Sequence, residues 1–95
     1  MPDLEHARMM LAMAQKDFQA LQGMLDNKTF ADEIFGFHAQ QAVEKTLKAW
    51  LSSAGVSYPK IHDLDEIVAL LENNGETVPR QFLSLLELTD FAVQF

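Results

Sequence analysis

The sequence has no cysteine, so it holds neither a disulfide framework nor a thiolate metal site. No apolar run approaches the roughly 18 residues that a membrane span needs, and the first residues lack the basic and then apolar pattern of a secretory signal. Glycine and proline are scarce, and no linker, repeat or low-complexity stretch is present. These absences indicate a soluble, cytoplasmic protein of 95 residues that forms one domain, residues 1–95.

Positive charge is also scarce, because seven Lys and Arg residues stand against 14 Asp and Glu residues, for a net charge of −7. Phosphate contacts come from Lys and Arg, so a protein that coats nucleic acid is excluded and no DNA partner is expected. The exception is residues 34–62, which carry three lysines and one glutamate between two net-negative blocks. If an anion binds to this protein, this segment is where it is expected to bind.

Apolar residues recur three and four positions apart along every segment, which predicts helices and no strand. The first predicted helix runs from residue 3 to residue 25, with Asp3 as its N-terminal cap. One apolar seam marks this helix, at Leu4, Ala7, Leu11, Ala14, Phe18, Leu21 and Leu25.

The second predicted helix begins at Thr29 and ends at Ala54, with Gly55 as its left-handed C-terminal cap. A third helix begins at Asp63 and closes at residues 73–75, and a fourth opens at Val78-Pro79, where proline suits the first turn. The sequence thus predicts an all-α protein, an antiparallel up-and-down four-helix bundle.

The second predicted helix has an apolar stripe and, opposite it, an unusually specific polar row. The stripe consists of Ala39, Ala42, Val43, Thr46, Leu47, Trp50, Leu51 and Ala54. The row consists of His38, Gln41, Lys45, Lys48 and Ser52, beside Gln40 and Glu44. Glu44 precedes Lys48 by four residues, the favourable order for an ion pair along a helix.

The run from Phe37 to Leu51, followed by the loop from Gly55 to Leu64, resembles the HEPN family (higher eukaryote and prokaryote nucleotide-binding domain) of prokaryotic toxin–antitoxin type. Members typically read A-x-Q-A-x-E-K-x-x-K-A, then a short loop with glycine, then T/I-H-D/S-L. The resemblance covers residues 8–75 and implies a HEPN-like helical domain that binds a nucleotide or interacts with another protein. It also implies pairing with a minimal nucleotidyltransferase in a toxin–antitoxin-type system.

The alternative function is an endoribonuclease toxin. The resemblance implies that a catalytically active member would carry an Arg-x(4–6)-His motif near the start of the last helix. Here Arg8 and Arg80 are the only arginines, and neither is followed by His at that spacing. The enzyme therefore requires a motif beyond residue 95, and we expect a chain that is truncated or ends early at its C-terminus. No catalytic residue, metal site or cofactor is expected within these residues.

From the positive segment and the resemblance together we predict a site for a nucleotide, RNA or partner protein. Ammonium groups would meet phosphate, and amide or imidazole groups would meet a base or ribose. The predicted residues are His38, Gln41, Lys45, Lys48, Lys60 and His62. A plainer interpretation stays open, in which the lysines are solvated charges and His62 is a helix-start residue that bonds the loop.

The predicted fourth helix is apolar around much of its circumference, which favours a subunit contact. We expect a twofold homodimer with Phe91 and Phe95 at its interface. Trp50 and Tyr58 are expected to be packed aromatic residues rather than platforms on which bases stack.

Overall fold

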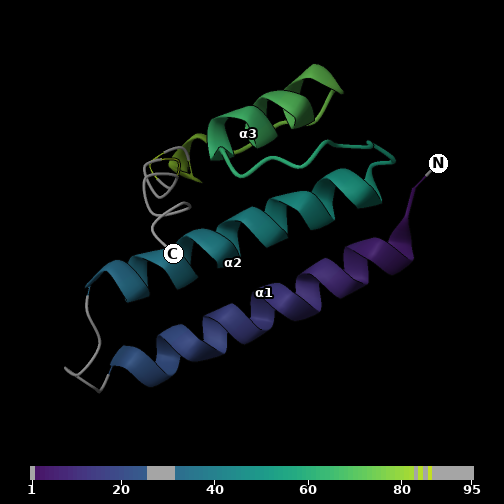
Figure 1. Cartoon of the computed structure of the whole chain (residues 1–95). Helices are drawn as coiled ribbons and strands as arrows, with labels where there is room; N and C mark the ends of the chain where they lie inside the picture. The colour runs from purple at the N-terminus through teal and green to yellow at the C-terminus, as the bar shows by residue number, and fades with distance from the viewer. Residues whose placement is uncertain (1, 26–31, 83, 85, 87–95) are drawn as a thin grey trace.

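The computed structural model describes residues 2–25, 32–82, 84 and 86. In this part of the chain the regular elements are three α-helices and no strand: α1 (Leu4–Leu25), α2 (Asp32–Ser53) and α3 (Leu64–Asn73). The helix α2 lies between the other two, antiparallel to α1 on one side and beside α3 on the other (Figure 1). None of these helices is long and apolar enough to cross a membrane.

The ends of the helices are set by the residues that the sequence singles out. The Asp3 carboxylate accepts a hydrogen bond from the backbone N–H of His6 at 3.0 Å, and Asp63 caps α3 by accepting from the Asp65 N–H at 2.9 Å. Gly55 has a φ of 79° directly after α2, and the Val56 N–H returns to the Leu51 carbonyl at 2.9 Å. This left-handed closure confirms the predicted cap.

The loop after α2 turns back along that helix, so α3 runs in the same direction as α2 (Figure 1). The start of α3 is fixed beside the middle of α2, because the His62 carbonyl accepts from Gln40 Nε2 at 3.2 Å. Beyond the end of α3, Glu76 accepts from the Trp50 indole N–H at 2.8 Å, and Trp50 lies six residues nearer the C-terminus of α2 than Glu44. The predicted up-and-down alternation is therefore wrong for α2 and α3.

The main core lies between α2 and α3. It consists of Leu51, Leu64, Ile67, Val68, Leu71 and Val78. Trp50 and Tyr58 are partly buried against this cluster, as expected of packed aromatic residues. A smaller cluster of Ala7, Met10 and Ala49 joins α1 to α2, and its small side chains let the two helix backbones approach closely.

The predicted seam of α1 divides into two rows. Ala7 and Ala14 are buried, whereas Leu4 and Phe18 are 53% and 56% exposed within the described chain and Leu11 is also exposed. The apolar spacing of α1 therefore predicts the helix correctly but not which of its residues contact α2, because α2 meets only the alanine row.

The predicted fourth helix lies mostly outside the described residues. After the buried Val78, the chain makes a turn of 3₁₀ helix at residues 80–82, with the Phe82 N–H bonded to the Pro79 carbonyl at 3.0 Å. Phe91 and Phe95, the predicted dimer contacts, are not among the residues that the structure describes.

Candidate functional site

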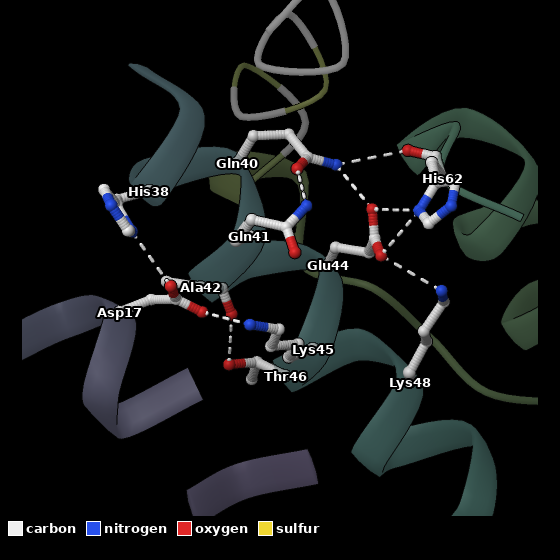
Figure 2. Close-up of polar contacts among 10 residues, drawn as sticks. All are labelled: Asp17, His38, Gln40, Gln41, Ala42, Glu44, Lys45, Thr46, Lys48 and His62. Atoms are coloured by element: carbon white, nitrogen blue, oxygen red, sulfur yellow. Dashed lines mark hydrogen bonds and ion pairs between the residues drawn. The ribbon is translucent and has the colours of Figure 1, made fainter. Parts of the chain in front are cut away.

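The polar row of α2 is divided into two hydrogen-bonded groups on opposite flanks of the helix (Figure 2). The first, named the Asp17 cluster, contains Asp17 of α1 with His38 and Lys45 of α2. The second, named the Glu44 cluster, consists of residues from α2 and from the loop before α3, namely Gln40, Glu44, Lys48 and His62.

The Asp17 cluster ties α1 to α2 through one carboxylate. Lys45 Nζ lies 2.6 Å from Asp17 Oδ2, and His38 Nδ1 lies 3.0 Å from Asp17 Oδ1. Asp17 is buried, and the side chain of Lys45 retains only 16% of its exposure. Each carboxylate oxygen therefore has its own charged or ionisable partner on α2.

In the Glu44 cluster, one buried carboxylate accepts from three side chains. Gln40 Nε2 donates to Oε1 at 2.7 Å, Lys48 Nζ lies 3.0 Å from Oε2, and His62 Nδ1 lies 3.0 Å from Oε2 and 3.2 Å from Oε1. The Glu44–Lys48 pair confirms the favourable order seen in the sequence. Gln40 is fully buried and also donates to the His62 carbonyl, which locks the loop onto α2.

The two carboxylates determine which ring nitrogen of each histidine carries hydrogen. An ionised carboxylate only accepts hydrogen bonds, so His38 and His62 must donate through Nδ1. In the neutral ring Nε2 is then the nitrogen with the free lone pair. The His62 side chain is 48% exposed, so this cluster holds an imidazole in a fixed orientation at the surface.

The structure does not gather the six predicted residues in one site. His38 and Lys45 belong to the Asp17 cluster, whereas Lys48 and His62 belong to the Glu44 cluster. Gln41 is an accessory to the second, since its Nε2 donates to Gln40 Oε1 at 2.6 Å.

Lys60 is exposed on the loop and has no carboxylate partner among the described residues. The plainer interpretation, in which the lysines are solvated charges, is wrong for Lys45 and Lys48, since Lys48 is only 6% exposed and Lys45 is mostly covered. Both lysines are held by carboxylates because α2 is covered on two flanks rather than one.

Sequence reasoning missed Asp17 and the burial of Gln40. A signal for Asp17 exists in the spacing, because it lies three residues after Ala14 and four before Leu21, on the row of α1 that faces α2. An acidic residue on such a row needs a cation from the neighbouring helix. Gln40 gives no comparable signal, since its partners come from the loop as well as from α2.

The polar contacts continue from Lys48 to the start of α1. Lys48 Nζ lies 5.6 Å from the centre of the Tyr58 ring, and the Tyr58 hydroxyl lies 2.6 Å from His6 Nε2. Burial raises the pKa of the Tyr58 phenol above its ordinary value, a hydrogen bond with Ser52 lowers it by less, and the Glu44 carboxylate adds to the rise. The phenol therefore keeps its proton at neutral pH.

Comparison with models of protein families identifies one family that matches this sequence. The model of the HEPN domain family matches residues 7–95, which extends past the range of 8–75 that carries the resemblance and takes in the segment after α3. No curated protein and no solved structure matches the sequence. No group of three or more His, Asp or Glu side chains within residues 2–25 and 32–82 is arranged to hold a metal ion.

Proposed function

Because this chain belongs to the HEPN domain family, a family of nucleotide-interacting or ribonuclease-like modules, we propose that it acts by binding a nucleotide and a partner protein. The observation that carries the proposal is the outer edge of the Glu44 cluster. There a buried carboxylate orients the exposed ring of His62, and Lys60 lies two residues away on the same loop. An imidazole and an ammonium group in that setting suit a phosphorylated ligand.

The other predicted residues support this edge rather than contact the ligand. Lys45 is already paired with the buried carboxylate of Asp17, and Lys48 with that of Glu44. A phosphate that bound either lysine would have to displace that carboxylate. Leaving either carboxylate buried without its cation is strongly unfavourable. In this proposal Lys60 and His62 touch the phosphate, while His38, Gln41, Lys45 and Lys48 hold α2 and the loop in position.

Binding is favoured over cleavage because the chemistry of cleavage is incomplete in these 95 residues. Neither Arg8 nor Arg80 is followed by a histidine at the spacing of the Arg-x(4–6)-His motif. His62 is one oriented imidazole, and within the described residues no arginine and no second histidine lies against it. Phosphodiester cleavage needs a proton acceptor and a proton donor together with a group that stabilises phosphate charge.

Nucleotide binding is tested by titrating the ¹⁵N-labelled protein with nucleoside mono-, di- and triphosphates. One exposed ammonium and one imidazole give weak affinity, on the order of micromolar to millimolar. Lys60→Gln should weaken binding several-fold, whereas Lys16→Gln, which removes an exposed lysine from α1, should leave it unchanged. Equal binding by both variants, or no binding at millimolar nucleotide, overturns the proposed site.

The partner proposed here is a minimal nucleotidyltransferase in a toxin–antitoxin-type pair, with the HEPN chain as a twofold homodimer through Phe91 and Phe95. The two proteins, expressed together from neighbouring genes, should elute as one complex whose mass contains two HEPN chains. Separate elution of the two proteins contradicts the pairing, and a monomer mass at micromolar concentration contradicts the homodimer.

The alternative is an endoribonuclease toxin whose Arg-x(4–6)-His motif lies beyond residue 95, a motif that these residues lack. The 95-residue chain should leave single-stranded RNA intact. Cleavage that survives rigorous purification and disappears in His38→Ala or His62→Ala would show that this chain is itself the enzyme.

A further inference from the structure

A cavity of about 410 Å³ is lined by residues from the start of α1, the end of α2 and the loop that follows α2. The start of α1 and the end of α2 lie at the same end of the helix pair (Figure 1). The cavity is separate from the two clusters of the polar row, and none of its lining residues is a lysine or an arginine. The residues that matter here are Asp3, His6, Ser52, Ser57 and Tyr58. Its volume is within the range of about 300 to 1,000 Å³ that small-molecule sites occupy.

The walls of this cavity are fixed by backbone hydrogen bonds. The Asp3 N–H donates to the Ser52 carbonyl at 2.8 Å, which joins the start of α1 to the last turn of α2. The left-handed turn at Gly55 closes the opposite side, with its N–H also bonded to Ser52. A ligand therefore meets a preformed pocket and loses less free energy to ordering the protein.

The side chains in the cavity present both donors and acceptors. The Tyr58 hydroxyl and His6 Nε2 share a hydrogen bond of 2.6 Å, whose direction is set by the tautomer of the His6 ring. The exposed Ser57 hydroxyl both donates and accepts. Asp3 uses Oδ1 to cap α1, and its carboxylate retains further acceptor sites.

This combination of acceptors and hydroxyls suits a group that carries several hydroxyls, and it disfavours phosphate. Carboxylates recognise ribose by accepting hydrogen bonds from its hydroxyls, as acidic residues do in dinucleotide-binding folds. A phosphate in the same cavity would face Asp3 with no cation to neutralise it. Lys60 is not one of the lining residues, but it is exposed on the same loop, two residues after Tyr58.

We infer that this cavity binds the nucleoside portion of a ribonucleotide, with the phosphate outside it toward Lys60. The inference rests on the proposed function and assigns to it a second site, for ribose and base. It predicts that a nucleoside without any phosphate binds, which a site made only of Lys60 and His62 does not.

The test is a titration of the ¹⁵N-labelled protein with adenosine, guanosine, cytidine and uridine, with their 5′-monophosphates, and with inorganic phosphate. At least one nucleoside should bind, shifting the amides of Ser57 and Tyr58, and its monophosphate should bind several-fold more tightly. Tyr58→Phe, which keeps the ring, should weaken both ligands about tenfold, since it removes one hydrogen-bonding group. Lys60→Gln should weaken only the monophosphate.

A bulky variant blocks the cavity without touching the core. Ser57 is exposed and lines the cavity, so Ser57→Trp should abolish nucleoside binding, whereas Ser53→Trp, at the exposed end of α2 and outside the lining, should not. Circular dichroism melting of each variant identifies any that fails to fold. If Ser57→Trp does not fold, the loss of nucleoside binding in folded Tyr58→Phe is the result that tests the inference.

The outcomes separate this inference from the proposed function. Monophosphate binding that depends on Lys60 but not on Ser57 or Tyr58, with no nucleoside bound, overturns the inference and leaves the phosphate site standing. Nucleoside binding that depends on Ser57 and Tyr58, with nothing gained from phosphate, supports the cavity and overturns the phosphate site. Absence of binding by every nucleoside and nucleotide overturns both.

Discussion

The Asp17 cluster and the Glu44 cluster contain the same three kinds of side chain, a carboxylate, a lysine and a histidine bonded through Nδ1. They differ in what they connect. The Asp17 cluster joins two helices, and its lysine reaches across from α2 to α1. The Glu44 cluster keeps its carboxylate and lysine one turn apart on α2, and only its histidine comes from elsewhere.

The difference in burial follows from these connections. In the Glu44 cluster the lysine and carboxylate side chains are about half as exposed as those of the Asp17 cluster, whereas its histidine is more exposed. Glu44 also has Gln40 as an additional donor. Two clusters with the same kinds of side chain therefore have different roles. The Asp17 cluster links two helices, and the Glu44 cluster is a buried support for the exposed imidazole of His62.

The largest effect is expected for Lys48→Glu. This change places two carboxylates side by side at a buried position, and breaking such a pair costs about 3–5 kcal/mol of stability. Urea unfolding followed by circular dichroism measures the loss, with the exposed Lys16→Glu as a control within about 0.5 kcal/mol of the parent. A Lys48→Glu protein as stable as the parent would mean that the Glu44 cluster is open to water.

A smaller loss of stability is expected when the lysine of either cluster is replaced by methionine, and the size of this loss should differ between the two clusters. Lys48→Met should destabilise the protein by about 3 kcal/mol, and Lys45→Met by about 1–2 kcal/mol, because the Asp17 cluster is closer to solvent. Adding Asp17→Asn to Lys45→Met should recover part of the loss, since no unpaired carboxylate remains. A double-mutant cycle for Asp17 and Lys45 measures their coupling. Equal losses for the two lysine variants would contradict the difference in burial.

Substituting the histidine of the Glu44 cluster should change stability only a little. His38 and His62 should also share one tautomer. His62→Ala should lower stability by about 1 kcal/mol or less, because half of the ring is exposed and Glu44 keeps Lys48 and Gln40. Long-range ¹H–¹⁵N spectra, recorded where the rings are neutral, should show hydrogen on Nδ1 in His38 and His62. Hydrogen on Nε2 in either ring would remove its bond to the carboxylate.

The smallest effect concerns Tyr58, whose ring lies over Lys48 and extends the Glu44 cluster. Its pKa in the folded protein is raised above 10.0, so its contribution to stability is fully present below about pH 10 and is lost as the pH rises through the folded pKa. Tyr58 is the only tyrosine, so phenolate absorbance reports it alone. Its midpoint should fall to the ordinary value on unfolding in urea. An unchanged midpoint would contradict burial of the phenol.

Local features of the fold were predictable from the sequence, because they depend on neighbours along the chain. Asp3, Gly55 and Asp63 act as the caps that their residue types predict, since each bonds to backbone groups a few positions away. The direction of α3 was not predictable in this way. It depends on the loop from residue 54 to residue 63 folding back along α2, which the bonds from Gln40 and Glu44 to His62 hold in place.

The candidate site was predictable in part, for a related reason. The sequence identifies Lys45, Lys48 and His62 as residues of one positive segment, and Glu44 as the partner of Lys48. Helical periodicity divides a helix into one buried and one exposed face, but α2 has neighbours on two flanks (Figure 1). Its polar row is therefore largely covered, and Asp17, 28 residues from Lys45, meets it only through the packing of α1.

The placement of the two ion pairs also bears on how this sequence can change over evolutionary time. Asp17 and Lys45 belong to different helices, so loss of either charge leaves the other buried until a second mutation, 28 positions away, compensates. Glu44 and Lys48 lie within five consecutive codons and are tied to a third position, His62. Substitutions at 17, 38 and 45 should therefore covary among homologues as one group, and those at 40, 44, 48 and 62 as another.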